Sequence, residues 1–190
     1  MNREDRMRRR AGVIAIVCAT WAGVAHAQVL DSSEASVSLT ATLAESLSLS
    51  VPTTDVSFSL TGGSATNPGN ATISVTTTYT LSASRTTLAL YAYFTTAATA
   101  LLHTDTNNTE NIPSSRVQGS VNGGTATAFT QTVAFGGAAA GLELFSIAVD
   151  PATSGGERTD TLALNINLAS LSLPADVYAG TLHIRAQATP

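Results

Sequence analysis

Lysine is absent from this chain of 190 residues, and cysteine occurs once, at Cys18. A chain without lysine has no flexible ammonium groups to bind the phosphates of nucleic acid or of anionic lipid. Cys18 lies in an apolar segment near the N-terminus, so residues 28–190 contain no cysteine and form no disulfide. The fold of this region therefore depends on apolar burial and on hydrogen bonds between chain segments.

The N-terminal segment is the most unevenly composed part of the chain. Residues 1–10 carry five arginines, residues 11–24 are mostly apolar, and Ala25-His26-Ala27 places small residues before a cleavage position. This order is typical of a Sec signal peptide. A membrane anchor is the alternative, but the apolar run is shorter than the roughly 20 residues that span a bilayer. We expect residues 1–27 to be a signal peptide and residues 28–190 to be a single domain, exported to the periplasm, the cell surface or the medium.

Acidic residues outnumber basic ones in the expected mature chain. Residues 28–190 hold four arginines against eleven Asp and Glu residues, a net charge of −7 with histidine neutral. This charge opposes binding to nucleic acid and docking on anionic lipid. No second apolar run reaches membrane-spanning length. We therefore expect partners that are other proteins, copies of the same chain met through sheet edges, or a surface glycan, and no membrane insertion after signal removal.

Threonine and serine fill most polar positions, and apolar residues alternate with them in many segments. Alternation with a period of two predicts half-buried β-strands. The alternating segments are residues 37–51, 56–60, 71–81, 117–121, 129–135, 142–149, 162–168 and 181–188. Residues 88–94 are continuously apolar and aromatic, which predicts a central strand buried on both faces. We interpret Tyr91, Tyr93 and Phe94 as a core cluster, with a ligand-stacking platform as the alternative.

Turn residues separate these segments at nearly regular spacing, and no segment has the apolar spacing of a good helix. Asn122-Gly123-Gly124, for example, predicts a hairpin turn of the primed type. About eight to ten short strands predict an all-β protein, an immunoglobulin-like antiparallel β-sandwich. A closed barrel is the alternative architecture. Residues 37–51, interrupted at Glu45, form either one long strand with a bulge or two strands in succession.

Titratable residues are too few and too scattered to predict an active site. The expected mature chain has two histidines, His103 and His183. It has none of the short motifs of serine hydrolases, zinc proteases or P-loop enzymes. We predict no catalytic residue, no cofactor and no enzymatic activity. A secreted enzyme stays open as an alternative, because a catalytic triad is assembled in space and not in sequence.

The least regular stretch is the polar loop of residues 95–113. A loop of this length in a compact domain is either functional or mobile. It contains the best cluster of oxygen ligands in the chain, Asp105, Asn107, Asn108 and Glu110. Calcium binds such oxygens, but the spacing lacks the central glycine and the further acidic residues of an EF-hand loop. We interpret the cluster as a solvated loop and predict no metal site, with calcium as the alternative.

The C-terminal segment carries the one family resemblance in the chain. It reads Leu173-Pro174-Ala175-Asp176-Val177-Tyr178-Ala179-Gly180-Thr181-Leu182. This resembles the L-P-A-G-x-Y-x-G-T-L ending of bacterial fimbrial-subunit-like and spore-coat-U-like proteins, with Asp176 where a glycine is common. The resemblance implies a bacterial secreted immunoglobulin-like β-sandwich that assembles through donated strands. The chain lacks the paired cysteines common in those families and does not end on their penultimate tyrosine.

Two readings of the function follow. We expect a secreted, non-enzymatic structural or adhesive protein of the cell surface, with a fimbria-like subunit as its most specific form. In this reading, residues 37–51 either join the sheet of their own domain or are lent to the sheet edge of a neighbour. The alternative is a monomeric extracellular module that binds carbohydrate or protein through residues 95–113.

Overall fold

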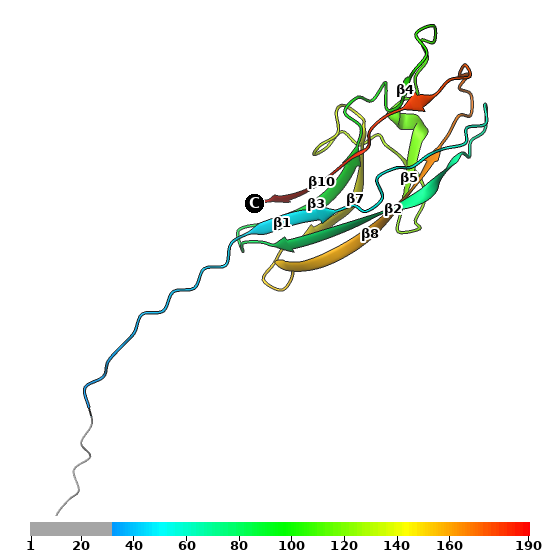
Figure 1. Cartoon of the computed structure of the whole chain (residues 1–190). Coiled ribbons are helices and arrows are strands. Elements are labelled where there is room, and N and C mark those ends of the chain that lie inside the picture. The colour runs from blue at the N-terminus through cyan, green and yellow to red at the C-terminus, as the bar shows by residue number, and fades with distance from the viewer. Residues whose placement is uncertain (1–31) are drawn as a thin grey trace, which may run out of the picture. The chain divides into compact units, whose positions relative to one another are not determined.

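The computed structural model describes residues 32–190 (Figure 1). The predicted signal peptide, residues 1–27, lies outside the described residues. Residues 32–41 and residues 42–190 belong to different compact units. Residues 32–41 have no regular secondary structure, and each of them is exposed. In the described part of the chain, no helix has the length and apolar character needed to cross a membrane.

Residues 42–190 form an all-β structure, as the sequence predicts. It contains ten strands and one short 3₁₀ helix, η1 (Ser114–Arg116). The strands are β1 (Ser46–Ser50), β2 (Pro68–Thr80), β3 (Thr87–Tyr93), β4 (Leu102–His103), β5 (Val117–Val121), β6 (Thr127–Ala128), β7 (Gly141–Ala148), β8 (Gly155–Ile166), β9 (Tyr178–Ala179) and β10 (His183–Thr189).

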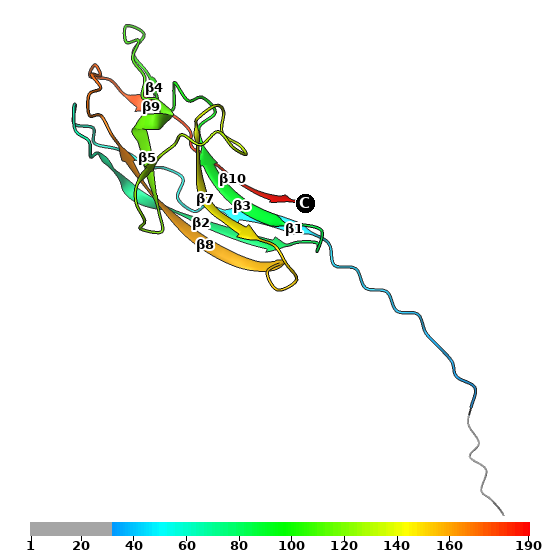
Figure 2. The same cartoon turned by 180° about the vertical axis from the view of Figure 1, so that it is seen from behind.

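All the strand pairs are antiparallel, and they build three sheets. The five-stranded sheet has the order β1-β2-β8-β5-β6, the three-stranded sheet has the order β10-β3-β7, and β4 pairs with β9. The two larger sheets lie one over the other with the apolar core between them (Figures 1 and 2). The arrangement is therefore sandwich-like, and β1 and β10 are edge strands of the two larger sheets.

The core is built from the inward positions of both larger sheets. Val75 of β2 and Leu162 of β8 are fully buried on one side, and Leu88 and Leu90 of β3 are fully buried on the other. Each large apolar side chain that is buried in this way stabilises the fold by about 1.5–3 kcal/mol. Phe129, also fully buried, follows β6 and lies between the sheets. The fold is thus held by alternating side chains and needs no disulfide.

Several predicted strands are confirmed in place and in orientation. The apolar segment 88–94 supplies β3, which is the central strand of its sheet. Asn122 and Gly123 have positive φ values of 51° and 73°, and the N–H of Gly124 donates to the carbonyl oxygen of Val121 at 2.8 Å. These are the features of the primed hairpin turn that the sequence predicts.

The prediction of a long strand over residues 37–51 is wrong for its first half. Only Ser46–Ser50 pairs with β2, and Leu39 is 89% exposed. The change occurs at Glu45, whose carboxylate accepts the backbone N–H of Ser82 at 2.6 Å and two hydrogen bonds from Arg85. The bond from Arg85, followed by that from Ser82, lowers the pKa of Glu45. Glu45 therefore marks the point where the chain joins the sheet.

The predicted strands over residues 56–60 and 129–135 are also wrong. Each is reduced to an isolated bridge, Phe58 with Gly69 and Gln131 with Gly141. In the second segment, Phe129 is buried in the core, whereas Ala134 has a φ of 69° that no strand residue adopts. The chain therefore leaves the sheet after Phe129 although its apolar residues continue to alternate.

Candidate functional site

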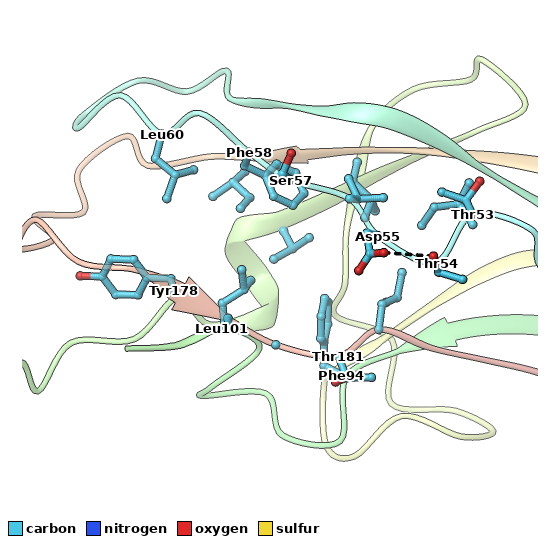
Figure 3. Close-up of a pocket in the computed structure, with 18 of the residues that line it drawn as sticks. Thr53, Thr54, Asp55, Ser57, Phe58, Leu60, Phe94, Leu101, Tyr178 and Thr181 are labelled. Atoms are coloured by element: carbon cyan, nitrogen blue, oxygen red, sulfur yellow. Dashed lines mark hydrogen bonds between the residues drawn. The ribbon is translucent and has the colours of Figure 1, made fainter. Parts of the chain in front are cut away.

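A cleft of about 780 Å³ lies between the segment that follows β1 and the segment that leads into β10 (Figure 3). Its walls come from residues 51–60 and residues 176–184, and its floor is apolar. The floor residues are Ile73, Phe94, Val117, Leu164 and Ile166. Because β1 and β10 are edge strands that contact each other, the cleft opens between the edges of the two larger sheets.

The first wall is attached to the beginning of β2. The N–H of Asn70 donates to the carbonyl oxygen of Ser57 at 2.9 Å, and the N–H of Ser57 donates to Oδ1 of Asn70 at 2.9 Å. A Cβ at Gly69 would lie 2.6 Å from Cγ1 of Val56, so a larger residue here would force Val56 to shift. In Figure 3, the side chain of Leu60 points into the cleft. The wall is thus fixed on the β2 side and apolar on the cleft side.

The second wall contains the motif that the sequence analysis singled out. The Tyr178 hydroxyl donates to the carbonyl oxygen of Pro174 at 2.9 Å and accepts a hydrogen bond from Nδ2 of Asn108 at 2.9 Å. A Cβ at Gly180 would run into the carbonyl oxygen of Ala100. Tyrosine and glycine in this motif therefore have separate roles. The tyrosine closes the turn after the proline, and the glycine lets two chain segments meet.

Asp176 ties this wall to the polar loop of residues 95–113. Its carboxylate accepts hydrogen bonds from Nδ2 of Asn108 at 2.8 Å, the Thr104 hydroxyl at 2.9 Å and the N–H of Asp105 at 3.1 Å. The N–H of Val177 donates to the same carboxylate at 2.7 Å. These donors, with Asn108 first, hold the pKa of Asp176 well below its ordinary value. The residue that departs from the family-like motif is thus the one that fixes the loop.

The loop itself is more regular than the sequence suggests. Leu102 and His103 form β4, which pairs with β9, and a bridge joins Leu101 to Ile112. Among the predicted oxygen ligands, Oδ1 of Asp105 accepts two hydrogen bonds from Asn107, and Oδ1 of Asn108 accepts the N–H of Glu110. These oxygens serve turns of their own loop. Within residues 32–190, no group of three or more His, Cys, Asp or Glu side chains is placed to hold a metal ion.

The two histidines occupy different surroundings. Nδ1 of His103 lies 2.8 Å from the carbonyl oxygen of Asp105, and His183 stacks on Tyr93 with ring centroids 5.3 Å apart. Neither imidazole forms a hydrogen bond with a side chain of another described residue. The interpretation of the aromatic group as a core cluster is confirmed for Phe94, which packs on Phe129, and Tyr91 is also buried, whereas Tyr93 is partly exposed.

No family model, curated protein or solved structure matches this chain. The likeness of its C-terminal segment to fimbrial-subunit-like proteins therefore stays a prediction, and the site is interpreted from its own geometry. An apolar cleft between two sheet edges suits an extended peptide, because the edges offer unpaired backbone groups and the floor accepts alternate side chains. Sequence reasoning missed the cleft, although Asp176 at a position where glycine is common was a usable signal.

Proposed function

We propose that this chain is an exported, non-enzymatic structural subunit of immunoglobulin-like architecture that assembles with copies of itself into a fimbria-like surface polymer. In this polymer, residues 37–43 of one copy occupy the cleft between residues 51–60 and residues 176–184 of the next. One observation carries the proposal. The same chain has an exposed segment with alternating apolar residues and an apolar cleft between two sheet edges.

The exposed segment has the composition of a buried strand. Val37, Leu39 and Leu43 are 82%, 89% and 85% exposed. Contiguous exposed apolar groups of this kind mark interaction sites in soluble proteins. In an extended conformation these three side chains share one face, and Thr40 and Thr42 share the other. Transferring one such side chain from water into a partner is worth about 1.5–3 kcal/mol.

The cleft offers the backbone hydrogen-bond partners and the apolar contacts that the exposed segment lacks. Its walls continue the two edge strands, because residues 51–60 follow β1 and residues 176–184 lead into β10, whose Ile184 lines the cleft. An inserted strand would satisfy such edges with main-chain hydrogen bonds and place its apolar side chains on the floor. A second copy of the chain is the occupant that the sequence itself provides.

The immunoglobulin-like part of the proposal has support from Tyr178. In sandwiches of that type, a tyrosine near the start of a strand donates its hydroxyl hydrogen bond to the backbone a few residues upstream. Tyr178 does this to Pro174, at the approach to β10. The two facing antiparallel sheets agree with the same architecture.

The test compares two double variants of the full chain in light scattering and electron microscopy. Leu39→Asp with Leu43→Asp places two charges on the apolar face of the segment, whereas Thr40→Asp with Thr42→Asp adds the same charges to its polar face. We expect ordered polymers from the natural chain and from the threonine variant, and monomers from the leucine variant. A natural chain that stays monomeric, or a leucine variant that polymerises normally, would contradict the proposal.

A peptide experiment tests the occupant directly. A synthetic peptide of residues 36–44 should bind the leucine variant and raise its Tm, since a ligand that binds only the folded state stabilises it. The same peptide with aspartate at positions 39 and 43 is the control and should leave the Tm unchanged. Equal effects of the two peptides would show that the cleft does not select this segment.

A further inference from the structure

The outer face of the three-stranded sheet gathers aromatic and cationic side chains. In the register of β3 and β10, His183 lies opposite Tyr93, and Arg185 lies opposite Tyr91. Paired residues of antiparallel strands project from the same face. Ala92, the inward residue between Tyr91 and Tyr93, is fully buried in the core. These four side chains therefore lie on the face of the sheet that is directed away from the core, where Tyr91 is buried and the other three are at least partly exposed.

Phe135 lies over this surface from the loop before β7. Its ring centroid is 5.6 Å from that of Tyr91 and 6.3 Å from that of Tyr93, and the guanidinium carbon of Arg185 lies 4.7 Å from it. The neighbouring Ala134 has a φ of 69°, a left-handed conformation that is strained for a residue with a Cβ. Such strain is often found where a loop shapes a ligand site.

Arg185 differs from the other three arginines of residues 32–190 in its contacts. Arg85 pairs with Glu45, Arg158 pairs with Asp160, and Arg116 donates to the carbonyl oxygen of Ala169. The guanidinium of Arg185 makes no hydrogen bond to a described residue and is exposed. A planar fork of donors that is stacked on a ring matches a carboxylate, which it binds through two parallel hydrogen bonds.

A hollow of about 300 Å³ adjoins His183 and is rich in hydroxyl groups. The threonines that line it are Thr95, Thr96, Thr99 and Thr181. None of these hydroxyls forms a hydrogen bond with another described residue. Ligand sites begin at about this volume, which suits one sugar unit.

We propose that this surface binds an acidic saccharide, a pyranose that bears a carboxylate, as uronic acids do. The ring pair of Tyr93 and His183 takes an apolar face of the sugar, Arg185 binds the carboxylate, and the threonine hydroxyls bind the sugar hydroxyls. The same face also holds the carboxylate of Glu143, which lies opposite Tyr91 and accepts the hydrogen bond of the Tyr91 hydroxyl at 2.7 Å. The guanidinium of Arg185, which has no hydrogen-bond partner among the described residues, is therefore the group that binds an anion here. This inference does not depend on the polymer proposed above, because Tyr93, His183 and Arg185 line neither the cleft nor the exposed segment 37–43. Among the four threonines, Thr181 alone also lines the cleft.

The test measures binding of trigalacturonate to the full chain by calorimetry and by NMR. Arg185→Gln removes the charge, and Gln187→Ala changes the next outward residue of the same strand as the control. We expect the natural chain and the control to bind alike, and Arg185→Gln to bind about tenfold more weakly or worse, because a charge-assisted pair is lost. The methyl ester of the trisaccharide should bind the natural chain as weakly as the acid binds Arg185→Gln.

Three results with the saccharide would overturn the proposal. They are equal affinity of the natural chain and Arg185→Gln, equal affinity for the acid and its ester, and the absence of binding at millimolar trigalacturonate. Triglutamate is the probe for an acidic peptide, and binding as tight as that of trigalacturonate would also overturn it. Thr181→Val should weaken acid and ester by a similar factor. The leucine variant of segment 37–43 should bind trigalacturonate like the natural chain, which separates this outcome from that of assembly.

Discussion

Asp176 shows how one side chain can organise a long loop without a metal ion or a disulfide. Its two carboxylate oxygens accept hydrogen bonds from a side-chain amide, a hydroxyl and two backbone N–H groups. The donors in residues 104–108 are about 70 positions away in the sequence, so no local pattern announces them. Hydrogen bonds to the charged form stabilise that form, which is why the pKa of Asp176 is lowered.

We predict that Asp176→Asn lowers the free energy of unfolding. The substitution replaces one carboxylate oxygen, an acceptor, by an NH2 group, a donor that would face the other donors. The pKa of Asp176 is depressed below its ordinary 3.8 only in the folded chain. Its contribution is therefore complete well above pH 3.8 and disappears as the pH falls through the folded pKa. In urea unfolding, the free energy of unfolding of the variant should lie below that of the natural chain by a constant amount from pH 7 to about pH 5. This difference should become smaller at lower pH.

Asp55→Asn is the matched control for this measurement. The Asp55 carboxylate accepts one hydrogen bond, from the adjacent Thr54, and is exposed. Its replacement should leave the free energy of unfolding nearly unchanged at every pH. A gap for Asp176→Asn that widens on acidification would contradict the assigned role.

At the scale of strands, the sequence pattern predicts elements whose apolar face meets the core of their own domain. β2, β3, β7 and β10 are such elements, and each lies close to where alternation or a continuous apolar run predicts it, whereas β8 extends from the predicted segment 162–168 back to Gly155. Residues 37–43 alternate equally well but remain exposed. Alternation shows that one face of a segment is apolar, but it does not show which surface will cover that face. The predicted strand over residues 129–135 is absent for another reason. Phe129 and Phe135 cover opposite faces of the three-stranded sheet, so the chain between them has to leave the strand direction.

The candidate site was less predictable than the strands. The cleft depends on how residues 51–60 lie along β2 and how residues 176–184 approach β10, and both are contacts between distant segments. The motif around Tyr178 was visible in the sequence, but its hydrogen bonds to Pro174 and Asn108 were not. Spatial pairing of this kind leaves no periodic trace in a single sequence.

A substitution at Gly180 tests whether the second wall of the cleft depends on the close approach of the segments that contain Gly180 and Ala100. Gly180→Ala should destabilise the chain by about 1–3 kcal/mol, the usual cost of overpacking, because the new methyl group meets the carbonyl oxygen of Ala100. Gly62→Ala is the control, since nothing lies within 4 Å of its Cβ position. Urea unfolding of the two variants should separate them clearly, and equal stabilities would show that the segments can move apart.

For the whole molecule, charge opposes the assembly that we propose. Copies of residues 28–190, each with a net charge of −7, repel one another over the screening length, which is about 30 Å at 0.01 M salt and about 3 Å at 1 M. We predict that polymer growth, followed by light scattering, accelerates as sodium chloride is raised across this range. The leucine variant of segment 37–43 should show no growth at any salt concentration. Slower growth at high salt would indicate that attractive ion pairs drive the contact.

The anchoring of Glu45 by Arg85 and Ser82 has a mechanical consequence for such a polymer. One residue, Ala44, separates this anchor from the segment that enters the next copy. A residue spans at most about 3.3–3.6 Å, so the junction contains almost no slack. Successive subunits would be coupled without a hinge, so the filament would be stiff and would not bend at the junctions between subunits.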